Sequence, residues 1–240
     1  MASSYSPKIA TNNLVLAWDA ANPKSYPGSG TTVYDLSGNG NNFTLINGTS
    51  YNAGGYFQTD GVNDYIKSAS TVNLSGYDYV VVDLWMKSLN DATYCQAFEH
   101  SNNWNTNTGG FGLFIHNNGS GYVKNMNHTN HNGSAARNYA FTMDQNWCNH
   151  INLYSKVSDS TGRLVWTNGN LTAFSNNNGY PTGTSTGAAS FRNDTIYMGA
   201  RGGTSAFGQG GYGSFKIYGF KFSDANSEQN FNALRSRYGI

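Results

Sequence analysis

Paired carboxylates are the first chemistry to test, because glycoside hydrolysis uses two of them, held about 5 or about 6.5–9.5 Å apart. The chain has two glutamates, Glu99 and Glu228, far apart in the sequence. Asp83 is the only carboxylate of segment 79–86. No local pair is formed, so we expect a protein that is not an enzyme. A polysaccharide-cleaving glycosidase is the third of three functional hypotheses.

Sugar binding without cleavage needs aromatic faces beside amide groups in a shallow, weakly charged site. Segment 102–107 places a tryptophan between asparagines, and two further tyrosines lie in segments that we expect to be loops. The predicted glycan-binding residues are Asn102, Asn103, Trp104, Asn105, Tyr180 and Tyr212. The alternative for each aromatic residue is packing in the core, which is where a sandwich buries most of its aromatic rings.

Calcium prefers hard oxygen ligands, and the candidate ligands in this sequence are Asp60, Asn63 and Asp64. The alternative, which we favour, is that these residues build a tight turn between two strands. His116, His128 and His131 lie in an Asn-rich loop that offers no strand or helix to fix a zinc site. We therefore expect no cofactor and no metal, with calcium as the alternative.

The composition indicates a large core under an almost uncharged surface. Among 240 residues, aromatic residues make up 15%, charged residues only 11%, and the net charge is +1. Without a basic run, the chain has no feature for binding nucleic acid or an anionic membrane. No apolar run is long enough for a membrane span. We expect Cys95 and Cys148 to be reduced core thiols, with a disulfide as the alternative.

Alternating apolar residues and Asn-Gly pairs predict an antiparallel β-protein. Asn-Gly favours tight hairpin turns, and the pairs 118–119 and 168–169 each separate two strand-like segments. Segment 80–86 is apolar on both faces, which is typical of a central strand covered on both sides. Segment 89–146 alternates weakly, so we expect long loops there, with two or three strands.

One α-helix is predicted near the C-terminus. Ser223 or Asp224 can cap its first amides, and Gly239 can end it. Phe231, Leu234 and Tyr238 would form one apolar stripe along it. We expect this helix to pack across the edge or end of the sandwich.

A glycine-rich segment, 208–213, formally matches a dinucleotide-binding pattern. That pattern binds a pyrophosphate only where a helix follows it, and here a strand-like segment follows. We interpret 199–213 as a flexible glycine loop.

Several motifs occur in a fixed order and together resemble the concanavalin A-like, laminin-G-type sandwich, in particular the variety found in structural proteins of tailed bacteriophages. The motifs are LAWD at 16–19, SYPGSGTT at 25–32, YDLSGNG at 34–40, FQTDGVNDYI at 57–66, WCNHINLY at 147–154, LVWTNGN at 164–170, TIYMG at 195–199, FKIY at 215–218 and QNFNALRSRYG at 229–239. The resemblance implies an all-β, two-sheet antiparallel jelly-roll sandwich with one C-terminal α-helix. The hydrolase branch of this fold carries Glu-x-Asp-x-Glu along one strand, and this chain lacks that spacing.

The resemblance also implies a function. We expect a single sandwich domain at 14–240, preceded by an N-terminal arm at 1–13 that docks onto other virion proteins, capsid or fibre subunits. The leading hypothesis is a non-enzymatic virion structural protein on the particle surface, a head-decoration or fibre-type component with affinity for host surface glycans. Such a protein would be a homo-oligomer, made in the host cytoplasm without a signal peptide. The alternative is a free carbohydrate-binding lectin module.

Overall fold

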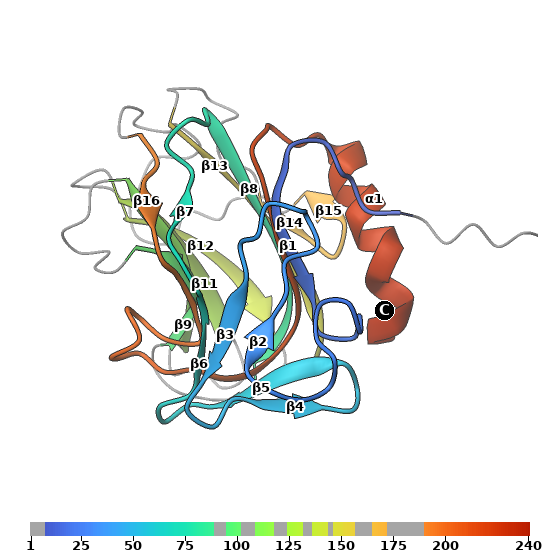
Figure 1. The fold of residues 1–240 in the computed structure, drawn as a ribbon. Helices are drawn as coiled ribbons and strands as arrows, with labels where there is room; N and C mark the ends of the chain where they lie inside the picture. Colours follow the sequence, from blue (N-terminus) through green and yellow to red (C-terminus); the bar gives the residue numbers. More distant parts are fainter. Residues whose placement is uncertain are drawn as a thin grey trace, which may run out of the picture.

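The molecule is a sandwich of two antiparallel sheets with one helix packed against the outside (Figure 1). The computed structural model describes residues 8–88, 95–101, 109–117, 124–131, 136–143, 146–156, 165–171 and 190–240. Sheet A, as described, has the order β15-β14-β13-β8-β18-β5-β4, and β1 also pairs with β18. Sheet B has the order β12-β11-β10-β9-β17-β6-β3-β2. A small third sheet pairs β16 with β7.

The strands of sheet A are β1 (Leu14–Asp19), β4 (Ser50–Asn52), β5 (Tyr56–Asp60), β8 (Tyr79–Ser88), β13 (Cys148–Ser155), β14 (Val165–Thr167), β15 (Asn170–Leu171) and β18 (Gln209–Tyr218). The strands of sheet B are β2 (Thr32–Val33), β3 (Phe43–Ile46), β6 (Tyr65–Ser68), β9 (Cys95–His100), β10 (Gly110–Asn117), β11 (Lys124–His131), β12 (Ala136–Met143) and β17 (Ile196–Met198). The third sheet contains β7 (Val72–Asn73) and β16 (Asn193–Asp194). The predicted all-β, two-sheet antiparallel fold is confirmed.

Strand β8 is the central strand that its sequence predicts. Val82 and Leu84 point inward into the main core, whereas Val81 and Trp85 belong to apolar clusters on the outer face of sheet A. The same alternation places Asp83 on the outer face, directly opposite Lys216 of β18. Every residue from Val80 to Met86 is buried, because the second sheet covers one face and the helix and its flanking segments cover much of the other.

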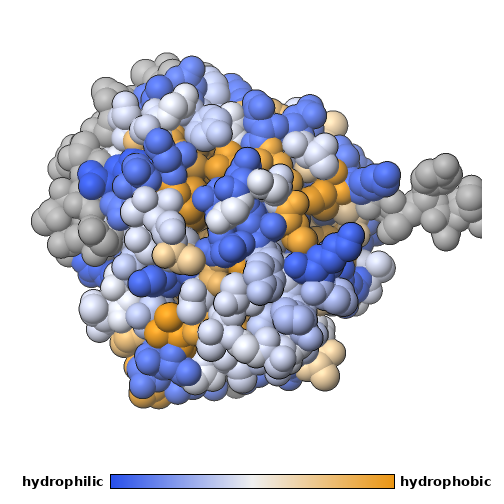
Figure 2. All heavy atoms as spheres, in the orientation of Figure 1, coloured by the Kyte–Doolittle hydropathy of each residue, from blue (hydrophilic) through white to orange (hydrophobic). Residues whose placement is uncertain are grey.

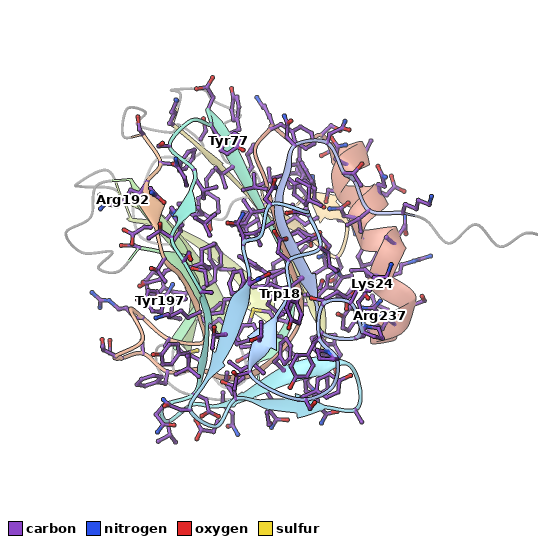
Figure 3. The ribbon with its side chains drawn as sticks, viewed as in Figure 1. Trp18, Lys24, Tyr77, Arg192, Tyr197 and Arg237 are labelled. Atoms are coloured by element: carbon purple, nitrogen blue, oxygen red, sulfur yellow. The ribbon has the colours of Figure 1, made fainter. Side chains whose placement is uncertain are left out.

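Aromatic rings fill the space between the sheets. Trp18, 1% exposed, lies within 6.3 Å of the rings of Phe43, Phe57 and Phe215, measured between ring centroids. Figure 3 shows Trp18 in the centre of the sandwich. Edge and tilted contacts of this kind add about 0.5–1.5 kcal/mol per pair to the free energy of apolar burial. The aromatic-rich composition is therefore explained largely by the core.

The helix α1 (Asp224–Leu234) is capped as predicted. Ser223 accepts a hydrogen bond from the amide of Asn226, the Asn226 side chain accepts one from the Ser223 amide, and the chain continues as the 3-10 helix η1 (Arg235–Tyr238). Gly239 ends it with a φ of 75°, in the left-handed region. The predicted stripe packs on Trp85, so the helix covers the outer face of sheet A rather than an edge or end of the sandwich.

The turn Asn168-Gly169 is a hairpin of the predicted type, with φ of 49° and 80°. A Cβ on Gly169 would lie 2.7 Å from the Phe231 ring, so glycine is required there both for its positive φ and for the approach of the helix. Of the other predicted hairpin, the strands β10 and β11 pair antiparallel, while residues 118–119 lie outside the described residues.

Two sequence-based expectations about loops are wrong in part. Segment 89–146 contributes four strands among its described residues, β9 to β12, where two or three were expected, and His116, His128 and His131 lie on strands rather than in a loop. Strand β18 starts at Gln209, inside the segment interpreted as a flexible glycine loop, and its glycines let neighbouring side chains cross the strand. The interpretation of 208–213 as unsuited to a dinucleotide is consistent with this strand.

Cys95 and Cys148 are buried and do not form a disulfide with each other. The described part of the N-terminal arm lies on the helix of its own chain, where Asn230 accepts a hydrogen bond from the amide of Ala10 and Gln229 donates one to the carbonyl of Lys8. Among the described residues, no helix is both long and apolar enough to cross a membrane.

Candidate functional site

Strand β5 presents a row of polar and aromatic side chains on the outer face of sheet A. Phe57 and Thr59 point inward and are fully buried. Because side chains alternate along a strand, Tyr56, Gln58 and Asp60 point outward; Tyr56 and Gln58 are half-buried, and Asp60 is exposed. This row connects an aromatic surface at one end to a polar hollow at the other.

The aromatic surface, which we call the Trp147 patch, consists of Tyr56, Lys87, Trp147 and Tyr238. Trp147 is half-buried and contacts Tyr56 edge-on at 5.2 Å and Tyr238 at 4.6 Å between ring centroids. The Nζ of Lys87 lies 4.4 Å above the Tyr56 ring and 5.3 Å from the Trp147 ring. Lys87 reaches them across Gly211, where a Cβ would come within 3.1 Å of its side chain.

The rings of the patch are held from below. Tyr238 stacks on Trp85 at 4.3 Å, and Trp85 stacks on Phe231 of α1 at 5.8 Å. Burial raises the pKa of Tyr238, so the ring stays neutral at physiological pH. Arg237 holds this end of the chain by a two-oxygen ion pair with Asp19, at 2.6 and 2.7 Å, beside the turn that carries Lys24 (Figure 3). Trp147 therefore rests on a rigid aromatic stack.

The polar hollow lies where β5 ends and β6 begins. Its volume is about 270 Å³, and it is lined by Gly48, Ser50, Gln58, Thr59, Asp60, Asp64 and Gln209. Asp60 accepts hydrogen bonds from the amides of Val62, Asn63 and Asp64, and these bonds, that of Val62 first, hold its pKa below the usual range. The hollow thus offers a carboxylate that is ionised at neutral pH, together with amide and hydroxyl groups.

Aromatic and polar groups on one face suit the binding of a sugar more than bond cleavage. A pyranose can lay its C–H groups, which carry slight positive charge, on a ring face while its hydroxyls bond to amides and carboxylates. The Trp147 patch and the polar hollow, joined through Gln58, together supply both kinds of group. We take this surface as the candidate site.

The predicted glycan-binding residues have mixed outcomes. Tyr212 is wrong as a loop residue, because it lies in β18 and is 2% exposed with its ring in the core. Asn102, Asn103, Trp104, Asn105 and Tyr180 lie outside the described residues. Those five remain predictions.

The three calcium candidates build the turn that we favoured. Asp60 accepts the three turn amides, and Asp64 is 4% exposed and accepts the amide of Gly48 at 2.7 Å. Asn63 accepts a bond from the Asn47 side chain through its backbone carbonyl. Among the described residues, no group of three or more His, Cys, Asp or Glu side chains could hold a metal ion.

The carboxylates considered for catalysis do not come together. Asp83 lies on the outer face of sheet A beneath α1, whereas Glu99 lies on the outer face of sheet B, opposite Tyr197 of β17. Burial raises the pKa of Glu99 to about 7, and its Oε1 accepts a hydrogen bond from the amide of Gly202 at 2.7 Å. Glu228 belongs to α1 and is exposed.

Sequence reasoning missed the Trp147 patch. In the sequence, Trp147 stands out only as the residue that leads a strand motif. Its partners Tyr56, Lys87 and Tyr238 come from three distant segments, and pairing of β8 with β13 and β18 is what brings them together. The single signal in the sequence was a tryptophan beside an amide, Asn146, at the start of a strand.

Comparison with known proteins gives the fold. No protein-family model and no curated protein matches the sequence. Among solved structures, the binding domain of botulinum neurotoxin serotype D is similar with a TM-score of 0.66 and 13% identity, over 92% of this chain and 52% of that one. The Trypanosoma rangeli sialidase in complex with the inhibitor DANA is similar with a TM-score of 0.65 and 11% identity, over 93% and 33%.

A third similar structure is the binding domain of botulinum neurotoxin DC in complex with SialylT, with a TM-score of 0.64 and 12% identity, over 93% of this chain and 52% of that one. The chain therefore spans about half the length of the toxin domains and a third of the sialidase. At these identities the comparisons establish a shared β-sandwich fold.

Proposed function

We propose that this protein is a non-enzymatic glycan-binding sandwich, carried on the surface of a bacteriophage particle as a head-decoration or fibre-type component. The observation that carries the binding role is the half-buried Trp147, supported on a stack of rings and continuous with the amide and carboxylate groups of β5. The solved complex of a similar toxin domain with SialylT supports the choice of a sugar as ligand.

A rigid, nearly uncharged surface fits this role. Ring stacking that is already in place costs no ordering entropy when the ligand arrives. Figure 2 shows the view of Figure 1, where hydrophilic and neutral residues predominate and hydrophobic colour is confined to patches. The charged groups that the structure describes at the site are of both signs, Lys87 and Arg237 against Asp19, Asp60 and Asp64, so binding should depend weakly on salt.

The binding role is tested by glycan-array screening followed by calorimetry on the best glycan. Trp147→Ala should weaken binding at least about tenfold, a change of about 1.4 kcal/mol, because the ring face is lost. Gln58→Ala should weaken it less. The matched control is Tyr34→Ala, which removes an aromatic residue that is 48% exposed on another strand connection. Equal affinity of Trp147→Ala and the wild type would place the sugar elsewhere, and an array without any signal would remove the glycan role.

The virion role is tested independently. Mass spectrometry of purified phage particles should find this protein at many copies per particle, with surface accessibility to added antibody. Its absence from particles, together with glycan binding, would favour the free lectin module. Reducing-sugar release that falls in Glu99→Gln or Asp83→Asn would favour the glycosidase instead.

A further inference from the structure

A buried polar cluster lies beneath α1, apart from the candidate site. Asp83 of β8, Asn149 of β13 and Asn230 of α1 are each 0% exposed, and Lys216 of β18 is 3% exposed. Apolar residues of similar size would pack such a position at no loss of stability, since burying an ammonium and a carboxylate is costly. Stability alone therefore does not explain why these four polar residues are buried together, and we consider a chemical role.

One carboxylate oxygen holds both an amine and a carboxamide. The Nζ of Lys216 lies 3.3 Å from Oδ2 of Asp83, and the Nδ2 of Asn230 donates to the same Oδ2 at 2.9 Å. Asn149 donates to the other oxygen, Oδ1, at 2.7 Å. A lysine amine and an amide carbon are thus gathered around a group that can take up and return a proton.

The two asparagines differ in how their amides are polarised. Oδ1 of Asn230 accepts a hydrogen bond from the amide of Ala10 at 2.8 Å, and Nδ2 also donates to the Tyr218 hydroxyl at 2.9 Å. A backbone N–H in that position stabilises the negative charge that develops on Oδ1 when a nucleophile adds to the amide carbon. Oδ1 of Asn149 has no hydrogen-bond partner, although it is buried. Asn230 is therefore the activated amide.

We propose that this cluster is a self-modification site, at which Lys216 and Asn230 join through an isopeptide bond. A proton passes from Nζ of Lys216 to Oδ2 of Asp83, which leaves a neutral amine. Nζ attacks Cγ of Asn230, and the oxyanion forms on Oδ1 beside the Ala10 amide. Asp83 delivers the proton to Nδ2, and the Cγ–Nδ2 bond breaks. The departing ammonia takes up a second proton from Nζ and leaves as ammonium, so the new amide nitrogen keeps one hydrogen. No oxidant or other reactant is needed.

The bond would fix the helix to the sheet. Lys216 is in β18, at the middle of sheet A, and Asn230 is in α1. One covalent bond would therefore join helix α1 to sheet A. The inference does not depend on glycan binding. It predicts a protein whose helix cannot detach from sheet A even when the rest of the chain is unfolded.

The decisive measurement is the intact mass of the denatured full-length protein. We expect it to be lower than the sequence mass by one molecule of ammonia, after allowance for removal of the initiator methionine. Succinimide formation at an Asn-Gly pair releases ammonia too, so the product is digested and mapped after hydroxylamine treatment, which cleaves at the succinimide and leaves an isopeptide bond intact. A branched peptide that joins Lys216 to Asn230 is expected.

The variants Lys216→Met and Asn230→Ala should retain the ammonia and have the full mass, as should Asp83→Ala. The control Lys24→Met replaces an exposed lysine and should still lose ammonia. A wild-type chain that keeps the full sequence mass after prolonged incubation overturns the proposal, and so does a branch that maps to Asn149. Should the buried variants fail to fold, the wild-type mass and peptide map alone decide the question.

Discussion

Asp83 and Glu99 are both carboxylates with 0% exposure, yet they differ in how many polar partners surround them. Asp83, on the outer face of sheet A, contacts Lys216 and two asparagines from three different elements. Glu99, on the outer face of sheet B, accepts one amide bond, and its Oε2 has no hydrogen-bond partner.

The difference follows from what covers each carboxylate. Lys216 of sheet A supplies a counter-charge to Asp83, and helix α1 carries the Asn230 amide onto the same carboxylate. The segment that follows β17 brings the Gly202 amide and the charge of Arg201 to Glu99, but burial outweighs both and raises the pKa of Glu99 to about 7. A buried carboxylate whose surroundings supply few donors has a raised pKa, because burial disfavours its charged form.

The largest expected effect on stability comes from removing Asp83, the carboxylate with several polar partners. Asp83→Ala should lower the free energy of unfolding by about 3–5 kcal/mol, because the Lys216 ammonium is left buried without its counter-charge. Urea denaturation monitored by circular dichroism measures it. The double variant Asp83→Ala/Lys216→Met should be more stable than Asp83→Ala, because neither charge is then buried alone and both variants lack the proposed bond. A loss below about 1 kcal/mol in the single variant would contradict it.

The second effect concerns Glu99 and pH. Its pKa in the folded protein is raised from 4.5 to about 7, so the folded state holds a proton that the unfolded state releases. Stability from this group is full below pH 4.5 and is lost as the pH rises to about 7, by roughly 1–3 kcal/mol. Glu99→Gln should flatten this slope in urea titrations between pH 5 and pH 8. A slope equal to that of the wild type would assign the pH dependence to other groups.

The smallest expected effect on stability comes from a change in helix α1, which covers sheet A. Ser223→Ala removes the side-chain cap of α1 and should lower stability by about 1 kcal/mol. Hydrogen exchange of the amides of β8 and β18 should accelerate, while that of β9 and β17 should change much less. Ser75→Ala, at an exposed turn, is the control. Equal acceleration in both sheets would mean that the helix does not act locally.

Much of the fold was accessible from the sequence because the signals are local. Alternation predicted β8 as a doubly covered strand, the Asn168-Gly169 pair predicted a hairpin, and Ser223 predicted the helix start. The candidate site was largely inaccessible. Strand pairing across long sequence separations brings Gln58 and Trp147 to the same surface, and the local sequence around each residue gives no indication of the other.

By itself, the sequence determined the class of fold, the central strand, the capped helix and the weakly charged composition, since these depend on periodicity and on short-range backbone preferences. Only the tertiary structure decided that Tyr212 lies in the core, that Trp147 surfaces beside the β5 row, and that Lys216 and Asn230 meet at Asp83. The physical reason is that register and helix docking, which set these contacts, are decided by burial summed over the whole molecule.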